Sequence, residues 1–457
     1  MSINRKSLNP YPHLFFTSRI TILLEMKLTQ RIRIFPTHKQ EFLLWILSEK
    51  CRLLYNFALA ERMENWHKNK NLPREKRHCV DYLIQSRALP GLKEKYPEYK
   101  WVYSKVLQTI LKKLELNYKS FFALWNKGDQ NARPPRFKGK KHFTTLCYNQ
   151  SGFKLQERSI IFSHKHPSNI ILKFEFPSHL IPQGIIKHVE LFQSDERWYI
   201  SLTYDLKVPE YHDNHSYQAF DLGINQTVGV NLSGNSIQFT HRRADLYWKK
   251  KIEEVQSKRD HCKKYSNKWH WYHKKLLQMI KKCAYQLKDF QHWLSNQIVS
   301  NTKANTIIVG DLKVKQMAQK KKGTSIAKKN RVNNTLNHSV HNTGYLSRFV
   351  EFLTYKAEKR GKKVIKIDES KTTKACCKCG KLEKRTIFER IITCDCGNRI
   401  DRDLNSAINI MIRFLSEKHK FDFLSHESSV NEESFLTQWN GFLRHTGQPV
   451  LEVVVHS

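Results

Sequence analysis

The most specific chemical signal in the sequence is a cluster of cysteines. Cys376 and Cys379 form a C-x-x-C pair, and after fourteen intervening residues Cys394 and Cys396 follow with one residue between them. A glycine comes directly after each pair and supplies the backbone freedom that a tight metal-binding turn needs. Four thiolates from two such turns suit a tetrahedral Zn²⁺ ion. Since four cysteines leave no open position for water, the pattern predicts a structural zinc site.

The same residues leave two alternatives open. The second pair is shorter than the usual C-x-x-C, so Cys377 is an alternative ligand. The other alternative is that these cysteines are free thiols or a redox pair. A secreted disulfide framework is excluded, because ten cysteines in 457 residues are sparse and half of them lie between Cys376 and Cys396. Zinc remains the favoured interpretation.

Acidic residues at the ends of apolar stretches need an explanation in a basic chain. Asp221 lies near the end of the apolar run 218–222, and Asp401 and Asp403 begin an amphipathic stretch. A turn carboxylate bonded to backbone would account for Asp221, and helix capping would account for Asp401. In-line cleavage of a phosphodiester instead needs clustered carboxylates that hold two Mg²⁺ ions about 4 Å apart. The acids therefore raise a nuclease hypothesis.

The balance of charge indicates a polyanionic partner. The chain has 80 Lys and Arg against 41 Asp and Glu, a formal net charge of +39, and 40% of its residues are hydrophobic. This composition predicts folded domains that bind nucleic acid. The best membrane candidate, residues 14–24, is too short to span a bilayer and contains Ser18 and Arg19. We therefore expect no membrane segment and a cytoplasmic, reducing location.

The first half of the chain combines strands with a helical insertion. Residues 27–35 alternate polar and apolar side chains and stop at Pro36, which predicts a strand. Apolar residues at helical spacing follow, and then a basic loop at 128–141 with two adjacent prolines. Short β-branched and aromatic runs come next, so we expect a small antiparallel sheet or barrel. The elements expected after the first strand are helices 40–65 and 103–125 and strands 170–176, 185–192 and 198–204.

From about residue 216, strands alternate with helices, which predicts an α/β layered domain. A long basic helical stretch at 242–300 is expected to form a hairpin broken at Ser266-Asn267. Its aromatic side chains are more often core between two helices than contacts to nucleic acid. The other expected elements are strands 218–222, 227–231, 306–309 and 363–367, a basic loop at 320–331, and helices 345–359 and 405–414.

Several stretches of the sequence resemble the TnpB (OrfB) proteins of bacterial and archaeal insertion sequences, which are relatives of the type V CRISPR effector nucleases. The resemblance extends from about residue 26 to 415 and keeps the family's order. The matching stretches are residues 26–64, 120–155, FDLGIN at 220–225, GDLKVKQM at 310–317, 345–361, the cysteine region 373–397, and DRDLNSAINI at 401–410.

The resemblance implies an α/β plus β-barrel fold and RNA-guided cleavage of DNA beside a short transposon-associated motif, with guide RNA and target DNA as partners. It implies that the protein is bacterial or archaeal and associated with the nucleoid. It also implies structural Zn²⁺ and catalytic Mg²⁺. The expected domains are an N-terminal extension (1–25), a β-barrel wedge domain (26–36 and 137–215), a helical recognition lobe (37–136), a RuvC-like nuclease domain (216–372 and 398–420), a zinc ribbon (373–397) and an acidic flexible tail (421–457).

The resemblance also assigns catalytic residues. Asp221 matches the first RuvC carboxylate and Asp403 the third. At the place of the second, the family usually has a Glu, and here that place is Gly310. Asp311 is adjacent, but neighbouring side chains of a strand point to opposite faces. We therefore predict Glu369, at the end of the strand that leads into the zinc ribbon, with Asp311 as the alternative.

Two other functions remain open. The glycine at position 310 raises the hypothesis of a nuclease-inactive, RNA-guided DNA-binding repressor. A transposase also uses a carboxylate triad on an RNase H fold. However, a cysteine cluster between the second and third acids, and an Asp as the last acid, fit that class poorly.

Overall fold

The computed structural model describes residues 23–177, 180, 184–311, 345–383, 389–418 and 451–454. The chain divides into two compact units. We call Glu25–Lys207 the N-terminal unit and Val208–Ser457 the C-terminal unit, and we describe each by itself. None of the helices in the described ranges is long and apolar enough to cross a membrane.

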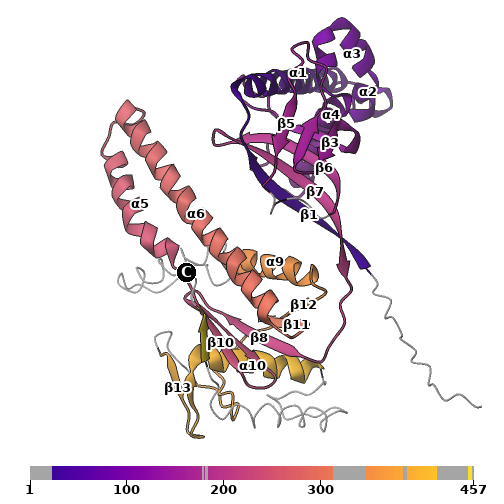
Figure 1. The fold of residues 1–457 in the computed structure, drawn as a ribbon. Helices are drawn as coiled ribbons and strands as arrows, with labels where there is room; N and C mark the ends of the chain where they lie inside the picture. The colour runs from indigo at the N-terminus through magenta and orange to yellow at the C-terminus, as the bar shows by residue number, and fades with distance from the viewer. Residues whose placement is uncertain are drawn as a thin grey trace, which may run out of the picture. The chain divides into compact units, whose positions relative to one another are not determined.

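The N-terminal unit packs a group of helices against antiparallel strands (Figure 1). Its longest helix begins at His38, and the preceding residue, Thr37, forms a capping box with Gln40. Its helices are α1 (His38–Asn69), α2 (Tyr82–Arg87), α3 (Leu89–Lys95) and α4 (Ser104–Asn126), with 3₁₀ turns η1 (Arg74–Lys76), η2 (Pro97–Trp101) and η3 (Gln150–Gly152). Its strands are β1 (Leu23–Ile34), β2 (Leu146–Asn149), β3 (Phe153–Gln156), β4 (Ser159–Phe162), β5 (Leu172–Glu175), β6 (Ile185–Ser194) and β7 (Arg197–Pro209).

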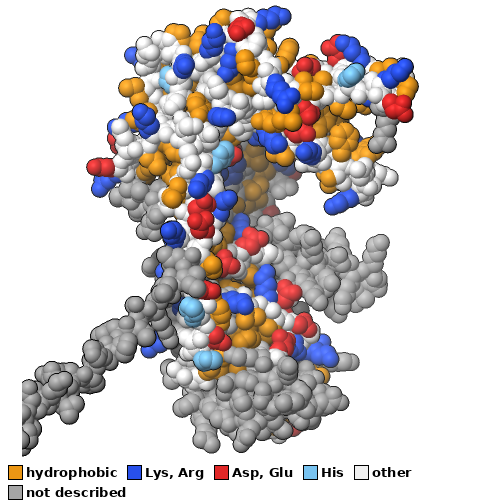
Figure 2. Space-filling view, turned by 90° about the vertical axis from the view of Figure 1, so that its right-hand side faces the viewer, with side chains coloured by type: hydrophobic (Ala, Val, Ile, Leu, Met, Phe, Trp, Pro, Cys, Tyr) orange, Lys and Arg blue, Asp and Glu red, His pale blue; other side chains and the backbone are white. Residues whose placement is uncertain are grey.

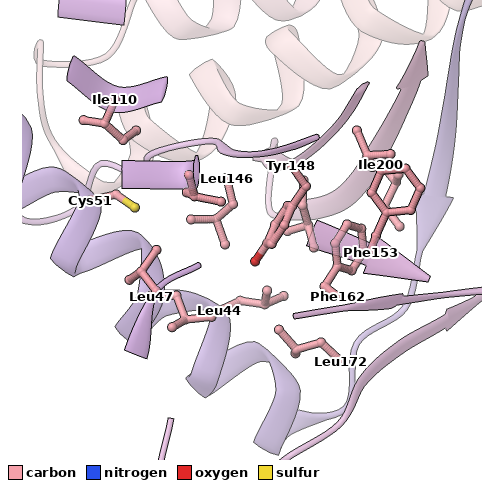
Figure 3. Close-up of a cluster of buried hydrophobic side chains, with 14 of the residues drawn as sticks. Leu44, Leu47, Cys51, Ile110, Leu146, Tyr148, Phe153, Phe162, Leu172 and Ile200 are labelled. Atoms are coloured by element: carbon pink, nitrogen blue, oxygen red, sulfur yellow. The ribbon is translucent and has the colours of Figure 1, made fainter. Parts of the chain in front are cut away.

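One hydrophobic core joins these helices and strands. Leu44 and Leu47 of α1, Ile110 of α4 and Tyr148 of β2 are each at most 1% exposed and belong to one cluster of buried side chains, part of which Figure 3 shows. The predicted helices and strands of this half are confirmed, with ends shifted by a few residues. On the surface, Figure 2 shows Lys and Arg side chains scattered among hydrophobic and acidic ones over the described residues that it displays.

The expected β-barrel is wrong for the described residues. The strands of the N-terminal unit form an open four-stranded sheet, in the order β1-β7-β6-β2, and a separate three-stranded sheet, β3-β4-β5. The 3₁₀ turn η3 separates β2 from β3, so the chain leaves one sheet and enters the other there. With strands of only four residues at this point, the edges of the two sheets do not join into a closed ring.

The C-terminal unit is built on a six-stranded sheet in the order β12-β11-β8-β9-β10-β15. Strands β8 to β10 form an antiparallel meander, and β11 and β12 lie parallel to β8. The strands are β8 (Tyr217–Leu222), β9 (Gln226–Asn231), β10 (Ser236–Thr240), β11 (Thr306–Gly310), β12 (Lys363–Ile367) and β15 (Leu451–Val454), with the short hairpin β13 (Ile391–Thr393) and β14 (Arg399–Asp401). The helices are α5 (Ala244–Asp260), α6 (Asn267–Asn301), α9 (Tyr345–Glu358) and α10 (Arg402–Lys418).

Helices cover both faces of this sheet, because successive residues of a buried strand point to opposite sides. Ala219 of β8 packs with α10, and the next residue, Phe220, packs with α6 and α9. The predicted hairpin is confirmed, since α5 ends at Asp260 and α6 begins after the capping residue Ser266 (Figure 1). The α/β layering predicted from the sequence is therefore present.

The acidic tail and the basic loop are described only in part. Of the tail at 421–457, the described residues form β15, which pairs in parallel with β10 at the edge of the sheet. The basic loop at 320–331 and the extension at 1–22 lie outside the described residues.

Candidate active site and zinc site

Two of the predicted catalytic acids lie at the carboxyl ends of parallel strands: Asp221 is in β8, and Glu369 comes two residues after β12. In the register of the sheet, Val309 of β11 lies beside Phe220 of β8, and Gly310 lies beside Ile367 of β12. Asp221 and Glu369 therefore come at the same carboxyl edge of three adjacent strands. Such an edge is where open α/β sheets bind their ligands.

Asp221 is electrostatically coupled to the other two predicted acids. Burial raises the pKa of Asp221 well above its usual value, and the negative charges of Asp403 and then Glu369 raise it further. The cation of Arg402 acts in the opposite direction. The charges of Asp403 and Glu369 thus both act on Asp221, but among the described residues the three carboxylates do not form a group whose oxygens all lie within 4.8 Å of one another. The repulsion acting on Asp221 favours a cation as counter-charge.

Gly310 and Glu369 occupy complementary positions. A Cβ atom built on Gly310 would lie 2.2 Å from Oε2 and 2.9 Å from Cβ of Glu369. The Glu369 side chain therefore fills the space into which a side chain at position 310 would point. Glu369 therefore brings a carboxylate from beyond the end of β12 to the space beside Gly310 of β11.

Asp311, the alternative to Glu369 as the second acid, is exposed, and its contacts differ from those of Glu369. Its backbone N–H donates to the Ile367 carbonyl at 2.6 Å, which extends the pairing of β11 with β12 by one residue. Its charge contributes, after burial, to raising the pKa of Glu369 to about 7, and Asp368 adds to the shift. Asp368 itself is held in a turn by the Ser370 backbone N–H at 3.2 Å. Of these two acids, Glu369 is the one whose charge acts on Asp221.

Asp403 enters the cluster from the first turn of α10. It is 6% exposed, and its Oδ2 accepts a hydrogen bond from Gln226 Nε2 of β9 at 2.8 Å. Two cations also contact its carboxylate: Arg390 Nη1 at 3.1 Å from Oδ2, and Arg402 Nε at 3.2 Å from Oδ1. The neighbouring Asp401 instead accepts from the backbone N–H of Asp403 at 2.9 Å and so caps α10, the role that its position predicted.

The cysteine cluster converges as its spacing predicted. The sulfur atoms of Cys376, Cys379, Cys394 and Cys396 all lie within 4.8 Å of one another. Cys376 Sγ lies 3.7 Å from Cys396 Sγ, and Cys379 Sγ lies 3.6 Å from Cys394 Sγ. A tetrahedral ion with Zn–S bonds of about 2.3 Å places sulfur atoms about 3.8 Å apart. The four-thiol cluster therefore fits a structural zinc site.

Each half of the cluster sits on a tight turn that ends in a left-handed glycine. The N–H of Gly380 donates to the Cys376 carbonyl at 2.8 Å, and that of Gly397 donates to the Cys394 carbonyl at 2.9 Å. Their φ angles are 74° and 79°, which glycine adopts without steric cost. Cys377 lies outside this ligand set and packs in the core beneath α10, where burial raises the pKa of its thiol to about 11.

Two asparagines that the sequence analysis missed fasten the cysteine turn to α10. Asn405 accepts from the Cys377 backbone N–H at 2.9 Å and donates to the Ala375 carbonyl at 2.8 Å. Asn409, one turn later, donates to the carbonyls of Thr372 and Ala375, each at 2.8 Å. Their spacing of four residues puts both on one helix face, and this was the available sequence signal. Because Asp403 begins the same helix, these bonds tie the zinc-binding turn to the acid cluster.

Three family models match the chain. One described as a helix-turn-helix domain matches residues 26–71, one described as a probable transposase (OrfB of IS605) matches 201–321, and one described as a Cas12f1-like TNB domain matches 347–410. The first range corresponds in the structure to strand β1 and the single helix α1. The third contains the whole cysteine cluster.

Similar proteins cover most of the chain. A putative RNA-guided DNA endonuclease, InsQ, of Escherichia coli (strain K12) is 27% identical over 386 residues, which are 82% of this chain and 89% of the relative. A putative RNA-guided DNA endonuclease of Streptomyces pristinaespiralis is 24% identical over 397 residues, covering 85% and 90%. Cas12f1 in its complex with sgRNA and target DNA matches the fold with a TM-score of 0.50 and 13% identity, over 85% of this chain and 98% of that one.

Proposed function

From the similarity of this chain to the TnpB (OrfB) family of insertion-sequence proteins, we propose that it is a transposon-encoded, RNA-guided DNA endonuclease. Asp221, Glu369 and Asp403 are the catalytic acids of this proposal. The observation that carries it is the fit of the Glu369 carboxylate into the space beside Gly310, together with its electrostatic coupling to Asp221. The missing family glutamate is thereby replaced from a neighbouring strand.

A RuvC-like fold for the C-terminal unit is part of the proposal. The strand order supports it, because a three-stranded meander is continued by two strands parallel to its first strand, with the acids at their carboxyl edge. The zinc-binding hairpin between Glu369 and Asp403 supports it as well, since Cys376, Cys379, Cys394 and Cys396 would hold Zn²⁺ and fix the start of α10.

The chemistry of the proposed site follows from its charges. When bound, two Mg²⁺ ions would activate the attacking water and stabilise the leaving oxygen. Asp221 and Glu369 would act as fixed anionic ligands from the sheet, and Asp403 as the ligand from α10. Gln226, which donates to Asp403, holds that carboxylate in one orientation. The net charge of +39 attracts the nucleic acid, and reading of the sequence is delegated to base pairing with the guide.

The test is cleavage by the purified ribonucleoprotein. The RNA that copurifies with the full-length chain would be sequenced, and a plasmid that carries the matching target beside a randomised flank would be incubated with the complex and Mg²⁺. We expect cutting, its loss in Asp221→Ala with binding retained, and no loss in Asp260→Ala, which removes a half-exposed carboxylate at the end of α5. Equal cutting by Asp221→Ala would reject the assignment.

A nuclease-inactive, RNA-guided repressor is the second candidate. Gly310 favours it, as do the contacts of Arg390 and Arg402 with Asp403, because they neutralise an acid that a metal ion would otherwise need. Tight, salt-sensitive binding of the matched target with no cleavage in Mg²⁺ or Mn²⁺ would support this function instead.

A further inference from the structure

Three side chains of types that commonly bind metals lie close together in the N-terminal unit. None of them takes part in the proposed cleavage. Cys147 of β2 and His188 and Glu190 of β6 bring a sulfur, an imidazole nitrogen and a carboxylate oxygen within 4.8 Å of one another. The sheet register produces this grouping. Cys147 is paired directly with Glu190, and His188 lies two residues from Glu190, so all three side chains share one face.

Two of the three donor separations are close to the edges of a metal tetrahedron. Cys147 Sγ lies 3.7 Å from Glu190 Oε1, and His188 Nε2 lies 3.5 Å from the same oxygen. Bonds of about 2.3 Å to sulfur and about 2.0 Å to nitrogen and oxygen place these donor pairs about 3.5 Å and about 3.3 Å apart in a tetrahedral zinc site. The third pair, Cys147 Sγ and a ring nitrogen of His188, lies within 4.8 Å, compared with about 3.5 Å in such a site.

Access and charge also suit a divalent ion. Cys147 is 4% exposed, whereas the His188 and Glu190 side chains are 38% and 43% exposed, so the cluster is closed on the sheet side and open to water on the other. A thiolate and a carboxylate together balance the charge of one divalent ion. Burial raises the pKa of the Cys147 thiol to about 12, and the Lys113 cation acts in the opposite direction. The pKa of Glu190 is lowered first by the hydrogen bond with His188, and Lys113 adds to this effect.

We propose that Cys147, His188 and Glu190 form a second zinc site, with water as the fourth ligand. Thiolate and imidazole donors together favour Zn²⁺ over Mg²⁺ or Ca²⁺. The ion links β2, a four-residue edge strand, to the longer β6 beside it. Since Leu146 and Tyr148 of β2 are part of the core shared with α1 and α4, the site stabilises the N-terminal unit.

The competing explanation is a hydrogen-bonded triad without metal, in which the Cys147 thiol and the His188 ring donate to Glu190. Zinc counting on the full-length protein separates the two. After equilibration with Zn²⁺ and removal of free ion, mass spectrometry of the metal should give two zinc ions per chain in the unaltered protein. It should give one in Cys147→Ser and one in Glu190→Gln, which keeps a hydrogen-bond acceptor but loses the anionic ligand. Cys79→Ser, an exposed cysteine, is the matched control and should keep two.

The cysteine ribbon provides the internal reference. Cys379→Ser alone should leave one zinc ion, and Cys379→Ser combined with Cys147→Ser should leave none. In the Cys379→Ser background, added Zn²⁺ should raise the melting temperature, and this rise should vanish when Cys147 is also replaced. One zinc ion per chain in the unaltered protein overturns the proposal, as do two ions that survive both Cys147→Ser and Glu190→Gln. These measurements need neither guide nor cleavage, so they are independent of the proposed nuclease activity.

Discussion

Replacing Gly310 by alanine should abolish most of the proposed cleavage while leaving nucleic-acid binding intact. The added Cβ would lie 2.2 Å from Glu369 Oε2, whereas ordinary van der Waals contact begins near 3.4 Å. The carboxylate must therefore move by about 1.2 Å, and a misplacement of about 1 Å at a reacting centre lowers a rate by about 100-fold. We expect a loss of that size in Gly310→Ala.

Single-turnover cleavage of matched DNA at saturating Mg²⁺ measures this loss directly, and a gel-shift titration measures binding. Gly139→Ala is the matched control, because a Cβ there meets no atom within 4 Å and the rate should stay unchanged. Circular dichroism melting of each variant tests whether the fold is retained.

Moving the carboxylate from position 369 to position 310 provides a second test. Glu369→Gly should be as inactive as Gly310→Ala, and adding Gly310→Glu to Glu369→Gly should restore part of the rate, because the double variant has the glutamate at the position usual in the related family. Wild-type cleavage by Gly310→Ala would refute the reasoning, since Glu369 would then not need the space beside position 310.

Two further predictions concern the contacts around α10. Arg390→Gln should lower the Mg²⁺ concentration for half-maximal cleavage by about two- to fivefold, because a half-exposed guanidinium that competes for Asp403 contributes about 0.5 to 1 kcal/mol; an unchanged or higher Mg²⁺ requirement would contradict this competition. Asn405→Ala should lower the free energy of unfolding of the C-terminal unit by about 1 to 3 kcal/mol, because it leaves the buried Cys377 N–H without its acceptor. Denaturant melting measures the second effect, and Asn301→Ala, an exposed amide at the end of α6, should have none.

Local patterns were sufficient to predict most elements. Ser266 supplies the side chain that caps α6. The break in the hairpin was therefore predictable from a capping residue between two helical stretches. The run 306–309 is apolar on both faces, which is typical of a parallel strand covered by helices, and β11 is buried throughout. The cysteine turns were predictable because ligand spacing and glycine requirements are both local.

The closure of a sheet is not a local property, and this is why the barrel prediction failed. Alternating residues in 143–206 indicate that strands exist, but the partner of each strand depends on the turns between them. The residues Gln150–Gly152 form a 3₁₀ turn that sends β2 and β3 into different sheets. Nothing in the alternation of those strands distinguishes this arrangement from a continuous barrel.

Position 310 illustrates how sheet register changes the meaning of a single residue. The resemblance to the TnpB (OrfB) family implies a glutamate at this point, and this chain has Gly310. In the sheet, Gly310 lies beside Ile367, and the Glu369 side chain extends back over the glycine. A side chain at position 310 and the present position of Glu369 therefore exclude each other. An acid at 369 without a glycine at 310 would be displaced, and a glycine at 310 without an acid at 369 would leave the site one carboxylate short. A variant that is meant to keep the site intact should therefore carry substitutions at both position 310 and position 369.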